Sequence, residues 1–181
     1  MKKTFDTLKI SGRDLCRVAL LTALTGIFAM LFTFRIGNTL KIPFKFIPVF
    51  VTAILYGPFW AGFAAVFGDI LNALLMPVGA FMPQITAVEF VGGFIYGLFL
   101  YRIFPSGKNI APRVLCCLAL QLLLDLFVTS ALLSSAGYFP GYGVAVAARF
   151  PCGILKAAIQ GLFIFPSKYY LQPIFKITGK N

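Results

Sequence analysis

Apolar runs alternate with short polar connections along nearly the whole chain of 181 residues. A helix that crosses the hydrocarbon core of a bilayer needs about 20 mainly apolar residues. The pattern predicts six such helices, at residues 18–34, 46–57, 59–75, 85–101, 114–133 and 144–165. We therefore expect an all-α membrane protein, a bundle of six transmembrane helices in a single integral membrane domain (residues 1–181) with structured outer loops.

The second and third spans come from one apolar stretch, residues 46–75, which is too long for a single crossing. Its break is the sequence Tyr56-Gly57-Pro58. Gly-Pro is a turn signal, and the residue before a proline disfavours helical backbone angles. The sequence therefore predicts a short helical hairpin between spans two and three.

The composition supports a membrane protein and excludes several function classes. Hydrophobic residues make up 60% of the chain and charged residues 12%, whereas soluble domains carry about 25% charged residues. The chain has no histidine, which excludes Ser-His and Cys-His nucleophile pairs and imidazole metal sites. We expect no enzyme activity, no metal and no cofactor.

The excess of 16 Lys and Arg over 5 Asp and Glu lies mainly at the ends and in the connections. We therefore expect a lipid bilayer, and no nucleic acid, to face these charges. With both termini in the cytoplasm, the cytoplasmic segments hold 11 basic residues and the outer segments 3. The eleven are Lys2, Lys3, Lys9, Arg13, Arg17, Arg102, Lys108, Arg113, Lys168, Lys176 and Lys180. The positive-inside rule thus predicts a multi-pass protein of the cell membrane with cytoplasmic termini.

The three outer basic residues, Arg35, Lys41 and Lys45, share one connection. Long basic side chains at helix ends often reach toward lipid phosphates. The same cluster could instead form an electropositive lid over a pocket for an anion. The sequence leaves both interpretations open.

Several polar or ionisable side chains fall within the predicted spans, where they are costly and face a bundle interior or a cavity. They either hold helices together by ion pairs or recognise a ligand. Near the outer ends of their spans, Arg149 and Glu89 favour a pocket, whereas Lys156 and Asp125, which lie deeper, favour structural pairing. The other polar groups of the outer half are Asp69, Asn72 and Gln84.

Aromatic residues also occur in or beside the outer loops, at Phe81, Tyr138, Phe139 and Tyr142. They could stack on a planar ligand, although a belt at the level of the lipid headgroups is commoner.

Small residues form a stripe along one face of the first span, at Ala19, Ala23 and Gly26. A stripe of this kind lets another helix approach closely. From spacing alone, packing inside the bundle is favoured over docking of a partner.

Residues 42–101 carry a set of motifs: Phe46-Ile47-Pro48, Leu55-Tyr56-Gly57-Pro58, Gly68-Asp69-Ile70, Pro77-x-Gly79-Ala80-Phe81-x-Pro83 and Gly93-x-x-Tyr96-Gly97. This block resembles the folate-family substrate-binding (S) components of energy-coupling factor (ECF) vitamin transporters. Ala19-x-x-x-Ala23 is similar to the motif by which S components dock on their coupling subunit.

The resemblance implies a pocket open to the outside that binds a vitamin, and partners that comprise a transmembrane coupling subunit and two ATP-binding-cassette ATPases. The chain has no Gly-x-x-x-x-Gly-Lys-[Ser/Thr] loop, so ATP chemistry would come from those partners. Folate is the ligand that the family and the charges favour, with its anionic tail at the basic residues. Its ring would contact at least one of Asp69 and Glu89. A thiamine-precursor pyrimidine, a queuosine precursor, or a scaffold without a ligand remain the alternatives.

Overall fold

The structure is a computed structural model and describes residues 11–36, 40–75, 82–101 and 110–166; for the two strands it describes the backbone alone. The helices are α2 (Gly12–Leu31), α3 (Phe46–Tyr56), α4 (Pro58–Leu75), α5 (Pro83–Leu100), α6 (Ile110–Leu123), the π-helical turn η2 (Leu124–Thr129), α7 (Ser130–Ser135) and α8 (Tyr142–Ile164). The strands are β1 (Thr33–Ile36) and β2 (Leu40–Pro43).

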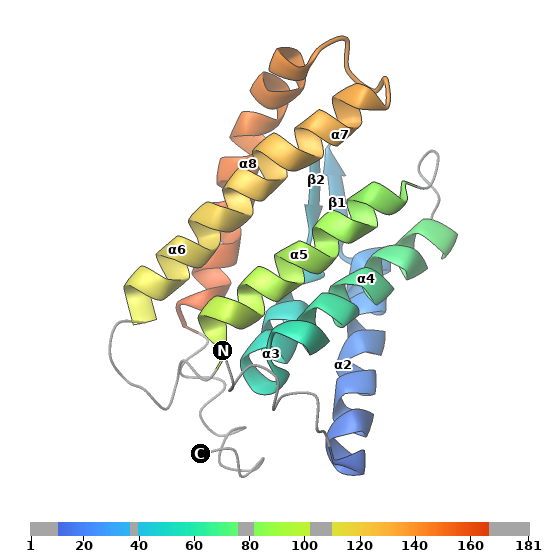
Figure 1. Ribbon diagram of the computed structural model, residues 1–181, viewed down its shortest axis with the longest axis vertical. Coiled ribbons are helices and arrows are strands. Elements are labelled where there is room, and N and C mark those ends of the chain that lie inside the picture. The colour runs from blue at the N-terminus through green and yellow to red at the C-terminus, as the bar shows by residue number, and fades with distance from the viewer. Residues whose placement is uncertain (1–10, 37–39, 76–81, 102–109, 167–181) are drawn as a thin grey trace.

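Helices dominate the arrangement, as predicted. Within the described residues, five helical segments are long and apolar enough to cross a membrane: α2, α4, α5, the continuous segment Ala111–Ser135 and α8. The apolar helix α3 is shorter than a full crossing. In Figure 1, α2, α3, α4 and α5 pack as one group, and α8 runs beside α6 and α7. The prediction of a helical bundle with six apolar segments is confirmed.

The turn of the hairpin between α3 and α4 is formed at a single glycine, Gly57. Gly57 has φ 91°, a left-handed conformation that side chains disfavour. Pro58 follows as the first residue of α4, where its missing N–H costs nothing. The predicted helical hairpin is therefore present, and its turn has the expected Gly-Pro chemistry.

The connection after α2 differs from the prediction. The first span was expected to run to residue 34, but α2 ends at Leu31, and Thr33 and Phe34 belong to β1. Strands β1 and β2 pair antiparallel, with Arg35 opposite Lys41. The predicted apolar run extends past Leu31 to Phe34, inside β1, so hydropathy did not distinguish the start of the strand from the end of the helix.

Other helix ends extend beyond the apolar runs. Helix α2 begins at Gly12 and α6 at Ile110, ahead of the predicted residues 18 and 114. Polar residues can continue a helix past the hydrocarbon layer, because the backbone hydrogen bonds remain within the helix. Hydropathy thus marked the apolar part of each helix but not its end.

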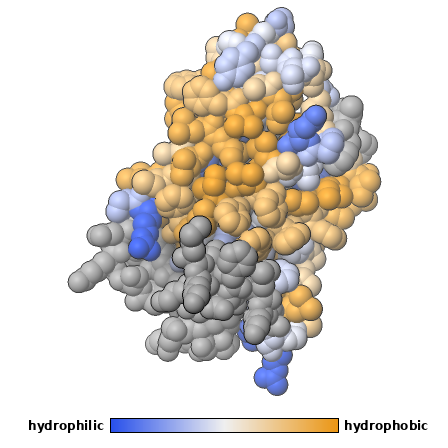
Figure 2. All heavy atoms as spheres, viewed as in Figure 1, coloured by the Kyte–Doolittle hydropathy of each residue, from blue (hydrophilic) through white to orange (hydrophobic). Residues whose placement is uncertain are grey.

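The outer surface of the bundle is apolar. Leu20, Leu74 and Leu162 are each more than 70% exposed. Figure 2 shows hydrophobic residues in a broad band across one face, with hydrophilic residues gathered mainly toward its two ends. This distribution fits a protein whose middle zone contacts lipid.

The interior, by contrast, contains polar groups. Thr25, Lys45 and Gln160 are all less than a tenth exposed. Buried polar groups need partners. Thr25 donates to the Leu21 carbonyl within α2, whereas Lys45 and Gln160 belong to the candidate site.

Candidate ligand-binding site

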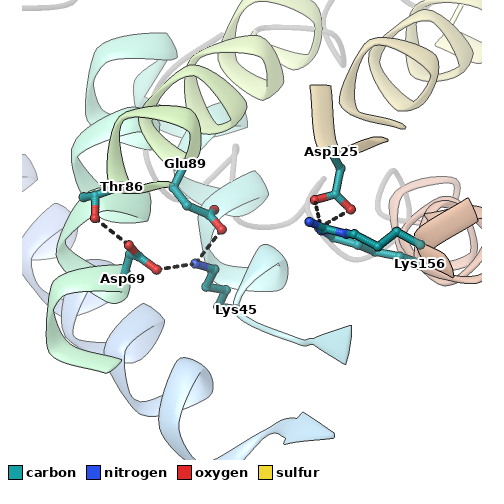
Figure 3. Close-up of polar contacts among 7 residues, drawn as sticks. Lys45, Asp69, Thr86, Glu89, Asp125 and Lys156 are labelled. Carbon is teal, nitrogen blue, oxygen red and sulfur yellow. Dashed lines mark hydrogen bonds and ion pairs between the residues drawn. The ribbon is translucent and has the colours of Figure 1, made fainter. Parts of the chain in front are cut away.

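A buried lysine joins two carboxylates from different helices (Figure 3). Lys45, directly before α3, has its Nζ 3.0 Å from Glu89 Oε1 on α5 and 3.5 Å from Asp69 Oδ1 on α4. Thr86 on α5 donates a hydrogen bond of 2.7 Å to Asp69 Oδ2. We call Lys45, Asp69, Thr86 and Glu89 the carboxylate cluster. It ties together three elements of the bundle.

A second group of charges lies between the fifth and sixth apolar segments. Asp125 Oδ1 accepts a hydrogen bond of 3.1 Å from Arg149 Nη2, and its Oδ2 is 3.4 Å from Lys156 Nζ. Asp125 stands in the π-helical turn η2, and turns of this kind often occur at functional sites. We call Asp125, Arg149 and Lys156 the cationic cluster.

The two clusters have opposite charge balances. The carboxylate cluster has two carboxylates and one ammonium, and the cationic cluster has two cations and one carboxylate. Their charged side chains are between 9% and 31% exposed. Partly buried charges require partners, and within each cluster the ion pairs leave a surplus charge, negative in the carboxylate cluster and positive in the cationic cluster.

A cavity of about 30 Å³ lies beside both clusters. Its lining comes from five helices and the residue before α3: Lys45, Phe46, Val49, Ala65, Glu89, Gly93, Tyr96, Gln121, Lys156 and Gln160. This volume holds one or two water molecules.

Several buried polar atoms have no hydrogen-bond partner in the described part of the chain. They are Asn72 Oδ1, Tyr96 OH, Gln121 Oε1, Ser130 Oγ and Arg149 Nη1. Buried polar groups in native proteins nearly always have a partner, which is water or a ligand where the protein supplies none. The interior therefore retains unused hydrogen-bonding capacity.

Three neutral polar residues of the cavity were not predicted from the sequence: Tyr96, Gln121 and Gln160. A signal was present for the two glutamines, because an amide inside an apolar run is unusual in a span. Tyr96 was quoted in a family motif but was not assigned to a site.

The predicted ligand-binding residues are placed in different ways. Lys45, Asp69 and Glu89 meet in one cluster, while Arg149 pairs with Asp125. Gln84 is exposed, Tyr142 is 45% exposed and Asn72 is partly buried. Phe81 lies outside the described residues, and for Arg35 and Lys41 only the backbone is described. These ligand contacts stay predictions.

The small residues of α2 divide into two kinds. Ala19 and Ala23 are exposed. Gly26 is buried against α4, where a Cβ atom would stand 2.5 Å from Leu71 Cδ1. Ala19 and Ala23 thus place two small side chains on the surface of α2, whereas Gly26 permits close packing inside the bundle.

These features define a class. The chain is a multi-pass helical membrane protein whose interior holds ionisable clusters and polar atoms that have no partner in the part of the chain that the structure describes. Among the described residues, no group of three or more His, Cys, Asp or Glu side chains could hold a metal ion. Such an interior suits an organic solute with several hydrogen-bonding groups.

The chain belongs to the S components of ECF-type vitamin transporters. Residues 9–167 match the family model described as ECF-type riboflavin transporter, S component. A folate transporter FolT of Streptococcus mutans is 30% identical over 155 residues, which span 84% of this chain and 81% of that relative. The predicted family resemblance is thereby confirmed.

Two further comparisons agree. A folate transporter FolT of Clostridium novyi is 37% identical over 75 residues, which span 41% of this chain and 44% of that relative. A crystal structure of FolT bound with folic acid matches with a TM-score of 0.72 and 28% identity, and the match covers 91% of this chain and 95% of that one. The similarity therefore extends over nearly the whole fold.

Proposed function

We propose that this chain is the membrane-embedded subunit that binds folate for an ECF-type importer. The observation that carries the proposal is the pair of oppositely balanced clusters beside one interior cavity. The similarity to FolT bound with folic acid, which covers 91% of this chain, supports the same ligand.

The two ends of folate suit the two clusters. The pterin ring presents an amino group and an adjacent N–H, and a carboxylate accepts from both together. Glu89 is the better placed carboxylate, because it is 31% exposed, whereas Asp69 is 17% exposed and also accepts a hydrogen bond from Thr86. Asp69 then holds the cluster in position.

The glutamate tail of folate carries two carboxylates and suits the cationic cluster. Arg149 uses Nη2 for Asp125, while its Nη1 is buried without a partner in the described residues. A carboxylate bound there would gain a charge-assisted hydrogen bond. Arg35 and Lys41, opposite each other in the β-hairpin, add positive charge to the chain segment that precedes Lys45.

Folate requires far more room than the present cavity, since ligand pockets measure about 300–1,000 Å³. Lys45 lines the cavity and occupies both carboxylates that the ring would use. Binding therefore requires the Lys45 side chain to move away from Glu89, and the ring amino group takes over its role as donor.

The importer's other subunits would be a transmembrane coupling subunit and two ATP-binding-cassette ATPases. Ala19 and Ala23, both exposed on α2, are the proposed docking patch for the coupling subunit. The excess of basic residues in one set of connections supports cytoplasmic termini.

Riboflavin is the second candidate ligand, because the matching family model is described by that vitamin. Riboflavin has a ring edge with N–H and C=O groups but no carboxylate. Arg149 Nη1, which has no partner among the described residues, and the surplus cation beside Asp125 therefore favour folate.

Ligand titration decides between the candidates. The chain is purified in detergent, its ultraviolet spectrum is recorded to detect a co-purified ring compound, and folate and riboflavin are then titrated by calorimetry. We expect pterin absorbance and tighter binding of folate. Tighter binding of riboflavin would show that riboflavin, and not folate, is the ligand. Binding of neither vitamin would refute the proposal and leave the scaffold without a ligand as the alternative.

A further inference from the structure

Three neutral polar side chains line the cavity beside the charged clusters: Tyr96, Gln121 and Gln160. Tyr96 and Gln160 are each 2% exposed. The Tyr96 hydroxyl and Gln121 Oε1 are buried and have no hydrogen-bond partner among the described residues. Because an unpaired buried polar group costs free energy, these atoms are suited to a partner that enters the cavity.

The three residues form a layer next to the charged layer. Each lies four or seven positions from a charged residue, which is one or two helical turns. The pairs are Glu89 and Tyr96 on α5, Asp125 and Gln121 on η2 and α6, and Lys156 and Gln160 on α8. Helices α5 and α8 run in one direction and α6 in the other (Figure 1). All three neutral side chains therefore lie on the same side of the charges.

Two adjacent glycines of α5 lie beside this layer, and they have different neighbours: Gly92 faces Gln121, and Gly93 faces the backbone of α4. A Cβ atom on Gly92 would stand 2.8 Å from Gln121 Nε2, so the amide rests against the helix backbone. A Cβ on Gly93 would stand 2.6 Å from the Ala61 carbonyl oxygen, and Gly93 itself lines the cavity. The position of the Gln121 amide thus depends on the missing side chain at Gly92.

From this arrangement we infer that Tyr96, Gln121 and Gln160 are the floor of the vitamin pocket and determine its specificity for the ring. The inference rests on the proposed function and adds residues that the two clusters do not include. The ligand class is a planar nitrogen heterocycle with adjacent N–H and C=O groups. An amide presents a donor and an acceptor side by side, and a phenol hydroxyl does both, so together they match that edge.

The test uses Tyr96→Phe, which removes only the hydroxyl. Because this hydroxyl has no partner in the described protein, its loss leaves the unfolding midpoint in detergent unchanged. We expect the affinity for folate to fall about tenfold. Pterin without the glutamate tail loses the same factor, because the floor contacts the ring. Gln121→Leu lowers the affinity for both ligands in the same way.

Ser130→Ala is the matched control, since Ser130 Oγ is also buried and unpaired among the described residues but does not line the cavity. It leaves both affinities unchanged. Undiminished binding of folate and pterin by Tyr96→Phe and Gln121→Leu would overturn the inference. If the unmodified chain binds only riboflavin, a tenfold lower affinity of Tyr96→Phe and Gln121→Leu for riboflavin still supports the inference that these residues form the floor of the pocket. If it binds neither vitamin, the proposed function fails and the floor with it.

Discussion

The ammonium group of Lys45 lies 3.0 Å from the carboxylate of Glu89, two residues that are far apart in the sequence (Figure 3). Asp69 is the second carboxylate on the same ammonium, at 3.5 Å. One cation thereby links α4 and α5 to the start of α3. In the proposed function Lys45 pairs with the carboxylates of Asp69 and Glu89 before the vitamin binds. It does not bind the glutamate tail of folate.

Lys45→Met should lower the free energy of unfolding. The substitution keeps most of the volume but leaves two partly buried carboxylates without their cation, at a cost of about 3 kcal/mol. Denaturant unfolding in detergent measures the loss. The matched control is Lys45→Met combined with Glu89→Gln, which removes one unpaired charge and recovers part of the stability. Strictly additive losses would show that the pair is not coupled.

Glu89→Gln and Asp69→Asn should separate ligand contact from structural support. An amide of equal size cannot accept from the ring amino group and the neighbouring N–H together. We therefore expect Glu89→Gln to weaken folate binding by about 2 kcal/mol. Asp69→Asn should mainly reduce stability, because Asp69 accepts from Thr86 as well as pairing with Lys45. Calorimetry measures folate binding and denaturant unfolding measures stability for both variants, with Thr86→Val for comparison. A larger loss of binding in Asp69→Asn and a larger loss of stability in Glu89→Gln would contradict this assignment.

Arg149→Ala should weaken the binding of folate by about 2–5 kcal/mol, the usual effect of removing one partner from a desolvated charge pair. Pterin without the glutamate tail should bind almost as before. Arg149→Lys keeps the charge but not the fork of donors, and should recover part of the affinity. Titrations with both ligands measure these effects. Equal losses for folate and pterin would mean that Arg149 maintains the fold through Asp125.

Ala19→Leu and Ala23→Leu should leave folate binding intact and abolish uptake. Both positions are exposed, so a larger side chain does not disturb the bundle but holds a partner helix away. Uptake is measured in proteoliposomes that also contain the coupling subunit and the ATPases. Gly26→Leu is the contrasting variant, because its side chain would collide with Leu71 and lower stability and binding together. Normal uptake by the two alanine variants would exclude this docking patch.

The elements of the fold were largely predictable, because hydrophobic length and turn chemistry are local properties. The apolar runs indicated the helices, and Gly57-Pro58 indicated the turn between α3 and α4. The β-hairpin was missed, because a strand is stabilised by a partner strand that the local pattern does not reveal. The predicted apolar run of the first span extends to Phe34, inside β1, so hydropathy did not mark the end of α2 at Leu31.

The candidate site was predictable only in part. Ionisable residues within apolar spans are costly, and this cost marked Glu89, Asp125, Arg149 and Lys156 as interior groups. Which of them pair was not evident, and Lys45 was placed in an outer loop although it is buried between two carboxylates. A neutral polar side chain costs less free energy in a membrane span than a charged one does, so Gln121 and Gln160 were not identified as site residues.

The sequence by itself determined that this chain spans a membrane, and its motifs indicated the family. Both the length of an apolar run and a short motif are local features that can be recognised without knowing which residues are in contact. The tertiary structure alone decided which charges meet. Arg149 and Asp125 are 24 residues apart and belong to different helices, so their pairing depends on how α8 packs against η2. The packing of α5 within the bundle likewise leaves the hydroxyl of Tyr96 buried, and Tyr96 lines the cavity. Contacts of this kind arise when helices that are distant in the sequence pack together, and no local sequence pattern specifies that packing.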